Sequence, residues 1–406
     1  MSGALRIVVA CAESPGHAFP GIALARALRA RGHEILLQTS NRWSDVAGAL
    51  GLRCLASEDL APGRRSGPWL ERAVAAGRSM IPAIEDFRAD AVVSDVVTAA
   101  PPLAAEAAGV KRATLMPLVY PLHQPGLPEY PLGLMPPRTP LGKAVWRAAN
   151  PAIRSLAPHT RWMRTVPAAL NDARAELGLP ALRRPYGEIS SFGHPISDGL
   201  AMLATFPQLE YRRDWPAHVH LTGPMLFERV HPEIALPEGE QPLVLVAAST
   251  VRDPQRLVAV SLEALAGEPV RVVATMNRAG GTWSGPVPGN AVVADWVSYA
   301  QLMPEASLVV CVGGHGTVVR ALSDGVPVLV APDAGDQAVN GARVTWARAG
   351  LTLPARLLRP GPLRWAVRHL LADTRFAAAA GRIAAWGAQH DGAQRGAELV
   401  ERYASR

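Results

Sequence analysis

Short apolar runs alternate along the chain with longer segments of helical periodicity. Leu5 to Ala10 and Glu34 to Thr39 are apolar runs of strand length. Between them, Pro20 to Arg31 repeats alanine and leucine at spacings of four, which predicts one apolar helix face. Pro20 suits the first helical position, and Gly32 ends the helix. A strand, a helix and a strand in this order predict a βαβ unit, and hence a parallel sheet with right-handed crossovers.

The first half continues with the same alternation. Strands are predicted at Ala91 to Val93, Ala113 to Met116, Leu200 to Ala204 and His218 to Pro224, and a helix is predicted at Ala100 to Ala108. Asp95 comes shortly after the strand Ala91 to Val93.

From Leu118 to about Arg164 the periodicity fails, because prolines and apolar side chains crowd together. The segment predicts a long, partly ordered loop that forms a hydrophobic pocket wall. Its aromatic residues favour a buried or ligand-facing role; they are Tyr120, Tyr130, Trp146 and Trp162.

Phe227 to Gln241 is polar, carries prolines and has no periodicity, as is typical of a linker. The alternation restarts at Leu243 and predicts a second doubly wound α/β domain. Its predicted elements are strands at Leu243 to Thr250, Arg271 to Thr275 and Ala291 to Ala294, a helix at Gln255 to Ala266, and C-terminal helices at Pro362 to Leu371 and Thr374 to Tyr403 with a break near Gly387 to Gly392.

One stretch of the second half reads as a ligand site. Leu308 to Val312 predicts a buried strand, Thr317 to Ser323 predicts a helix, and Gly325 is placed to end it. Between strand and helix, glycines permit a tight turn and close backbone approach; they are Gly313, Gly314 and Gly316. A glycine turn that opens a helix predicts an anion site, because free N–H groups and the helix dipole point at the ligand.

A second strand, Val326 to Ala331, follows this helix, and polar residues come after it. They are Asp336, Gln337 and Asn340, at the carboxyl end of a parallel strand, where open α/β sheets bind ligands. A phosphate site beside an acid and an amide predicts a nucleotide-linked, hydroxyl-rich ligand.

Length, composition and charge narrow the class of protein. At 406 residues two domains are expected, and 49% hydrophobic content is typical of a soluble, well-packed protein. No apolar run reaches the ~18 residues of a membrane span, and the N-terminal run is too short for a signal peptide, so a cytoplasmic enzyme is expected. The net charge of +7 is spread along helices without a dense cluster, which argues against nucleic acid.

The three cysteines, Cys11, Cys54 and Cys311, have neither disulfide nor metal-ligand spacing, so no zinc site is predicted.

The chain resembles the inverting GT-B glycosyltransferases of the UDP-glycosyltransferase superfamily. Within that superfamily it is most similar to the actinobacterial natural-product branch. Two motifs carry the resemblance: SPGHAFPGIALARALRARGHEI near the start and GVPVLVAPDAGDQAVNGARV in the second half. It covers nearly the whole chain. It implies an α/β fold of two Rossmann-like domains facing across a cleft, with an acceptor domain at 1–224, a linker at 225–241 and a donor domain at 242–385. The helix of residues 386–406 is expected to pack back on the acceptor domain.

The resemblance implies transfer of a hexose from a UDP- or dTDP-sugar to a hydroxyl of an apolar small molecule, without a metal or cofactor. His17 is the candidate base, because an unperturbed imidazole titrates near neutral pH. Asp95 would orient it, as an aspartate orients histidine in hydrolases. His33 and His123 lack such a partner in the sequence. The sequence leaves open whether the chain forms a homodimer.

The family places the donor in the second half. An aromatic residue near Trp296 stacks on the nucleobase there, and neighbouring backbone groups bond the base edge. Asp336 and Gln337 match the pair that binds sugar hydroxyls. The predicted donor-binding residues are Ser249, Thr250, Trp296, Val297, Gly313, Gly314, His315, Gly316, Thr317, Asp336 and Gln337.

One position departs from the family pattern. A histidine usually precedes the paired glycines and contacts the diphosphate, whereas this chain has Val312. Valine can neither donate a hydrogen bond nor carry charge. This leaves open a catalytically weak or silent homologue that acts as a binding or helper protein. A sugar-nucleotide epimerase also stays open, because such an enzyme can share the fold. A dinucleotide dehydrogenase is disfavoured, because no G-x-G-x-x-G opens the first helix.

Overall fold

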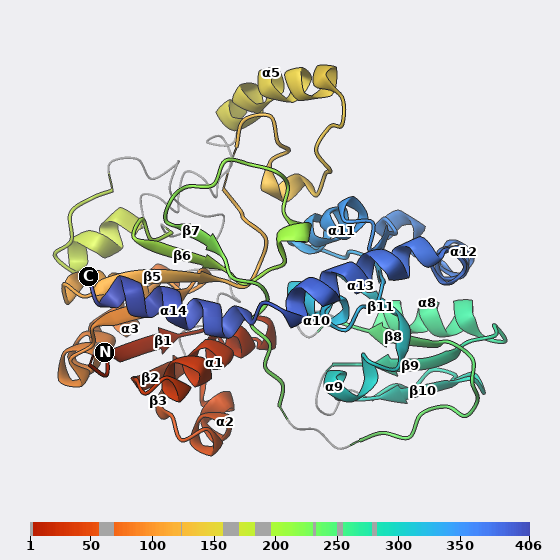
Figure 1. Ribbon diagram of the computed structural model, residues 1–406, viewed down its shortest axis with the longest axis horizontal. Helices are drawn as coiled ribbons and strands as arrows, with labels where there is room; N and C mark the ends of the chain where they lie inside the picture. Colours follow the sequence, from red (N-terminus) through yellow and green to blue (C-terminus); the bar gives the residue numbers. More distant parts are fainter. Residues whose placement is uncertain are drawn as a thin grey trace.

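The computed structural model describes residues 3–56, 69–122, 124–156, 170–182, 196–229, 233–249, 255–277 and 282–406. The chain forms two α/β domains, each built on a parallel sheet, and they lie side by side in Figure 1. This is the fold class that the alternating pattern predicted.

The N-terminal sheet has the strand order β3-β2-β1-β4-β5-β6-β7, and all of its pairings are parallel. Ile7 and Val9 face one apolar cluster and Val8 faces another, so β1 is buried on both sides. The strands are β1 (Arg6–Ala10), β2 (Glu34–Thr39), β3 (Arg53–Ala56), β4 (Ala91–Asp95), β5 (Lys111–Met116), β6 (Leu200–Leu203) and β7 (Val219–Leu221).

Helical elements alternate with these strands along the first half of the chain. They are α1 (Pro15–Ala30), α2 (Ser44–Ala49), α3 (Trp69–Phe87), α4 (Ala100–Ala107), α5 (Pro140–Leu156), a helical run at residues 170–176, and the short 3-10 turns η1 (Asn41–Trp43), η2 (Tyr130–Leu132) and η4 (Pro207–Leu209).

The first helix begins at Pro15, so the predicted start at Pro20 is wrong. Pro15 takes the first-turn position, where a missing N–H costs nothing. Pro20 lies inside the helix, where it removes the hydrogen bond that the Gly16 carbonyl would otherwise accept. As a consequence, His17 lies in the first helical turn and not in a loop.

The C-terminal sheet has the order β10-β9-β8-β11-β12-β13. Its strands are β8 (Leu243–Ala247), β9 (Arg271–Thr275), β10 (Ala291–Ala294), β11 (Ala306–Cys311), β12 (Val328–Val330) and β13 (Gly350–Thr352). The helical elements are α8 (Gln255–Leu265), α9 (Tyr299–Leu302), α10 (His315–Ser323), α11 (Gln337–Trp346), η5 (Ala355–Leu357), α12 (Pro360–Ala372), α13 (Thr374–Ala388) and α14 (Gly392–Ala404).

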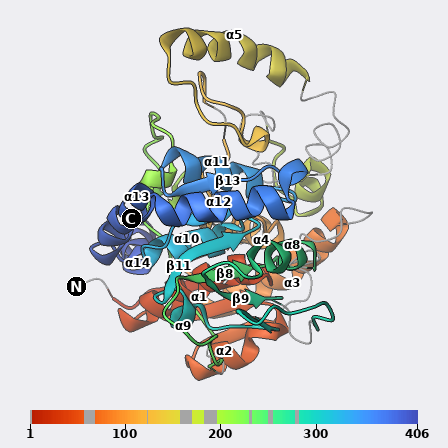
Figure 2. The same ribbon diagram turned by 90° about the vertical axis from the view of Figure 1, so that its right-hand side faces the viewer.

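The proline-rich segment differs from its prediction. Pro140–Leu156 is helix α5, which stands apart from both sheets in the two views (Figures 1 and 2). Leu118 lines the cavity that also holds His17, but no later described residue of the segment does, so the predicted pocket wall is wrong for that part. Tyr120 is buried in the N-terminal domain, while Tyr130 packs on the core of the C-terminal domain. Trp162 and His123 lie outside the described residues.

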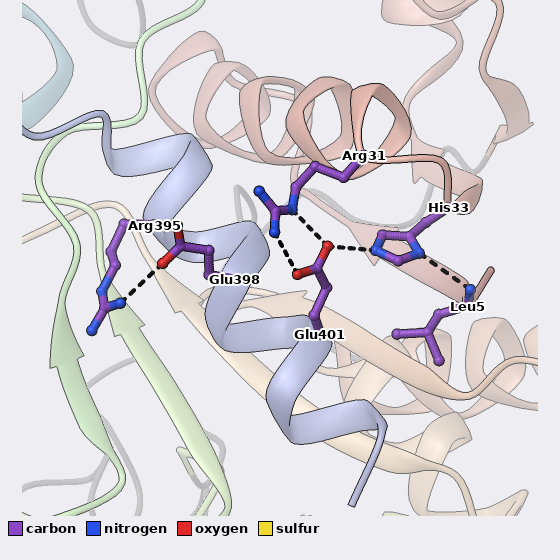
Figure 3. A network of polar contacts seen from close by, with 6 residues as sticks. All are labelled: Leu5, Arg31, His33, Arg395, Glu398 and Glu401. Atoms are coloured by element: carbon purple, nitrogen blue, oxygen red, sulfur yellow. Dashed lines mark hydrogen bonds and ion pairs between the residues drawn. The ribbon is translucent and has the colours of Figure 1, made fainter. Parts of the chain in front are cut away.

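Helix α14 lies against α1 and β6 of the N-terminal domain. Glu401 accepts hydrogen bonds from Arg31 Nε at 2.6 Å and Nη2 at 2.7 Å, and its Oε1 lies 2.7 Å from His33 Nε2 (Figure 3). The backbone N–H of Leu5 donates to His33 Nδ1 at 3.2 Å. His33 therefore has a partner after all, and its role is structural. Among the described helices, none is long and apolar enough to cross a membrane.

Candidate active site

His17 and Asp95 meet at the carboxyl edge of the N-terminal sheet. Asp95 ends β4, which pairs with β1, and α1 begins shortly after β1. His17 Nδ1 lies 3.1 Å from Asp95 Oδ1 and 2.9 Å from Oδ2. The N–H of Val97 donates to Asp95 Oδ1 at 2.8 Å, which fixes the carboxylate. An Nδ1–H that donates to Asp95 leaves the Nε2 lone pair to accept a proton.

Electrostatics favour a proton on this imidazole. Burial by itself lowers the pKa of His17, but the charge and hydrogen bond of Asp95 outweigh burial, and the pKa is raised above its ordinary 6.5. The charge of Asp336, from the other domain, acts in the same direction. The Asp95 carboxylate is fully buried, whereas 24% of the His17 side chain is exposed. The pair thus has one solvent-facing member and one orienting member.

A cavity of about 410 Å³ opens between the two domains, and His17 lines it. Nine of the predicted donor-binding residues line the same cavity; they are Ser249, Trp296, Val297, Gly314, His315, Gly316, Thr317, Asp336 and Gln337. Asp95 is absent from the cavity wall, as befits a buried orienting group. Thr250 lies outside the described residues.

Gly313 shapes the site without lining it. Its φ is +92°, and a Cβ there would come 2.5 Å from Val330 Cγ1, so this turn requires glycine. Its carbonyl accepts a hydrogen bond from Asn340 Nδ2 at 2.9 Å. Helix α10 begins at His315, two residues earlier than predicted, and its first turn faces the cavity. Gly325 follows the helix at φ +75°, as predicted.

Asp336 and Gln337 lie together but have different tasks. Asp336 precedes α11 without a side-chain cap, so the helix does not use its carboxylate. Asn340 Nδ2 donates to Asp336 Oδ2 at 3.3 Å, and burial raises the pKa of Asp336. Gln337 Oε1 accepts from the N–H groups of Asp333 at 2.7 Å and Ala334 at 2.9 Å. That oxygen holds its own loop, so only the amide Nε2 of Gln337 is left to donate to a sugar.

His315 does not simply replace the missing histidine at Val312. Its Nε2 lies 3.0 Å from Thr205 Oγ1 of the other domain. Burial, followed by the charges of His17 and Arg343, lowers the pKa of His315 to about 3. The ring is therefore neutral and brings no positive charge to a phosphate. Val312 itself lines the cavity and packs on an apolar cluster.

Several cavity residues escaped the sequence analysis. Asn277, buried at φ 49°, donates to the Ala248 carbonyl at 2.6 Å and to the Tyr299 hydroxyl at 3.0 Å. Arg320 Nε donates to Asp324 at 2.9 Å, and its Nη1 lies 3.7 Å from Glu228. An asparagine two residues after a predicted strand was the available signal for Asn277. Glu228 lies in the predicted linker, where no periodicity places a side chain.

Known glycosyltransferases resemble this chain over nearly its whole length. Residues 259–399 match the family model of the erythromycin biosynthesis protein CIII-like C-terminal domain. The chain is 28% identical to 4'-demethylrebeccamycin synthase of Lentzea aerocolonigenes, over 98% of this chain and 99% of the relative. The chain is a glycosyltransferase, and its fold is GT-B.

Solved structures show the fold of this glycosyltransferase independently. The calicheamicin glycosyltransferase CalG4 superposes with a TM-score of 0.73 at 21% identity, over 100% of this chain and 99% of that one. The glycosyltransferase VinC, solved in complex with dTDP, superposes with a TM-score of 0.66 at 20% identity, over 99% and 100% of the two chains. In the part of this glycosyltransferase that the structure describes, no three His, Cys, Asp or Glu side chains gather as metal ligands.

Proposed function

We propose that the chain transfers a hexose, with inversion, from a UDP- or dTDP-sugar to a hydroxyl of an apolar small molecule. One observation carries the proposal: the His17 imidazole, bonded to Asp95, opens into the same cavity as the first turn of α10 and Asp336. A base, an anion-binding helix end and a hydroxyl-binding acid thus share one space.

The base removes the acceptor proton. His17 Nε2 takes the proton as the acceptor oxygen attacks the anomeric carbon, and Asp95 stabilises the imidazolium that forms. A single attack that displaces the diphosphate from the opposite face inverts the anomeric carbon. The base contributes roughly 10²–10⁴-fold to the rate.

The leaving diphosphate gains negative charge, and the first turn of α10 stabilises it. Its first-turn N–H groups and its dipole stabilise that charge without a cation. Trp296 would stack on the nucleobase, and Asp336 with Gln337 Nε2 would bind sugar hydroxyls. On these grounds we propose that transfer needs neither a metal ion nor a cofactor.

The apolar part of the cavity wall supports the proposed class of acceptor. Its apolar side chains come from α1, the end of β5 and the connection between the domains; they are Phe19, Pro20, Leu118, Met225, Leu226 and Phe227. An apolar body with one hydroxyl near His17 suits this surface.

The test is a transfer assay. Purified protein is incubated with UDP-glucose or dTDP-sugars and a set of apolar hydroxylated compounds, with and without EDTA, and products are identified by mass spectrometry. We expect a hexosyl product that survives EDTA. Loss of product on chelation, with return on adding Mg²⁺, would refute the metal-free site. An altered sugar without acceptor would indicate the epimerase, and nucleotide binding without any product would indicate the silent helper, which the apolar Val312 on the cavity wall favours.

A further inference from the structure

The segment after β6 leaves the N-terminal sheet and enters the core of the C-terminal domain. Phe206 and Leu209 belong to the same apolar cluster as Val318 and Val319 of α10. The Phe206 ring also meets Trp386 edge-on, with centroids 6.1 Å apart. At this point the two domains share one core, so their relative position is set by side-chain packing.

One polar contact lies inside this shared core. Thr205, which directly follows Ala204 and precedes Phe206, is fully buried, and its Oγ1 lies 3.0 Å from His315 Nε2. His315 is the first residue of α10. Because the ring is neutral, this is an uncharged hydrogen bond between the domains. A buried pair of this kind is costly to break, since the remaining partner is left without its hydrogen bond.

The contact between Thr205 and His315 is one of two contacts between the first turn of α10 and the N-terminal domain. On one side, a Cβ on Gly316 would lie 3.7 Å from the Cα of Gly16, the residue before His17. On the other side, Thr205 follows β6, which pairs with β5, which pairs with β4, whose last residue is Asp95. The first turn of α10 therefore meets the N-terminal domain at two points: it approaches α1 closely at Gly316, and it contacts Thr205 through His315.

We propose that Thr205 and His315 are a positioning pair, which fixes the phosphate-binding turn of α10 relative to the His17 imidazole. This inference rests on the proposed function. The apolar packing around Phe206 holds the two domains together, and the bond from Thr205 adds a directional contact at the first residue of α10. Without the hydroxyl of Thr205 the donor still binds the C-terminal domain, but the anomeric carbon moves away from the base. A displacement of about 1 Å can cost on the order of 10²-fold in rate.

The test compares three threonine variants. Thr205→Val removes the hydroxyl at nearly constant shape, and Thr205→Ser restores it. Thr222→Val is the matched control, because Thr222 is also buried and donates within its own domain, to the Leu203 carbonyl at 2.9 Å. For Thr205→Val we expect kcat to fall about tenfold or more, with donor KM and the Kd of UDP or dTDP within about twofold. Thr205→Ser and Thr222→Val should keep kcat within about threefold of wild type.

Three results would overturn the pair. These are an unchanged kcat in Thr205→Val, an equal loss of kcat in Thr222→Val, and a rise in donor KM and nucleotide Kd at constant kcat. The last would make His315 a plain donor ligand. Should Thr205→Val not fold, Thr205→Ala serves in its place with the same expectation.

A second readout needs no turnover. Hydrogen exchange of residues 14–20 is followed while UDP or dTDP is added. Nucleotide bound to the C-terminal domain should protect this segment of the N-terminal domain in wild type and Thr222→Val, but not in Thr205→Val. Equal protection in all three would refute the pair. If wild type binds nucleotide but transfers no sugar, the proposed function fails while this experiment still decides on Thr205 and His315.

Discussion

His17 Nδ1 lies 2.9 Å from Asp95 Oδ2, although the two residues are 78 positions apart in the chain. Adjacent parallel strands bring them together, because β1 and β4 end at the same edge of the sheet. The early start of α1 at Pro15 then sets His17 in a helical turn, which limits its motion more than a loop would. The proposed base is thus supported by regular structure on both sides.

Replacing His17 by alanine should abolish most turnover while leaving the donor site intact. Loss of the base should reduce kcat by roughly 10²–10⁴-fold. Calorimetry with UDP or dTDP should give a Kd close to wild type, because α10 and Trp296 are unchanged. Wild-type turnover in His17→Ala would show that another group takes the acceptor proton.

The pH dependence of kcat/KM reports on the same pair. Protonated His17 cannot act as a base, so the rate should rise with pH through a midpoint above 6.5, as the raised pKa of His17 requires. Asp95→Asn removes the charge that holds the proton, so burial should then move the midpoint to lower pH. The plateau rate should also fall, since the imidazolium loses its partner. An unmoved midpoint in Asp95→Asn would leave Asp95 with a structural role only.

Asp336 and Gln337 should respond differently to alanine. Asp336→Ala should raise donor KM by about 10-fold or more, because a sugar hydroxyl loses a charged partner worth roughly 1.5–3 kcal/mol. It should leave the Kd of free UDP or dTDP unchanged. Gln337→Ala also frees the loop at Asp333 and Ala334, so it should lower thermal stability as well. Equal loss of affinity for the free nucleotide and the sugar nucleotide in Asp336→Ala would place this carboxylate away from the sugar.

Val312→His should tighten the binding of UDP or dTDP. The new imidazole would lie beside the phosphate oxygens at the start of α10, where a charge-assisted hydrogen bond adds about 1.5–3 kcal/mol before the cost of burying the ring. Because Val312 packs on the apolar cluster, Val312→Leu is the control for lost packing. Weaker nucleotide binding in Val312→His than in Val312→Leu would mean that the phosphate is held entirely by the backbone of α10.

Glu401 should anchor the C-terminal helix. Its hydrogen bonds from Arg31 lower the pKa of Glu401 to about 2, so the ionised form stabilises the folded state above the ordinary 4.5 and loses this effect as pH falls toward 2. Glu401→Gln should lower stability at pH 7 by about 1 kcal/mol, since the pair is partly solvent-screened. The difference from wild type should narrow below pH 4.5.

Glu398→Gln is the control for this helix. Glu398 pairs with Arg395 at 3.0 Å on the exposed face of the same helix (Figure 3). Its replacement should leave the unfolding midpoint almost unchanged. Equal destabilisation by both variants would mean that the charge of the helix, and not its contact with α1, determines the effect on stability.

Elements with strong local signals could be predicted from the sequence. Glu34–Thr39, Arg271–Thr275 and Ala291–Ala294 are strands with the predicted bounds. Such runs are apolar because parallel strands are covered by helices on both faces, so their composition alone marks them. Asp336 beside Gln337 was equally visible, since polar residues at a strand end stand out from the apolar run before them.

Tertiary packing decided the rest. Prolines hid the true start of α1 and the helix α5, because Pro15, Pro20 and Pro140 each permit a helix only in certain positions. The side-chain oxygen of Gln337 accepts a hydrogen bond from a backbone N–H group of its own loop, which only the folded structure brings within reach. The bond between Thr205 and His315 joins residues 110 positions apart on different domains. Local periodicity determined which segments became strands and helices, whereas these contacts depended on how the two finished domains fit together.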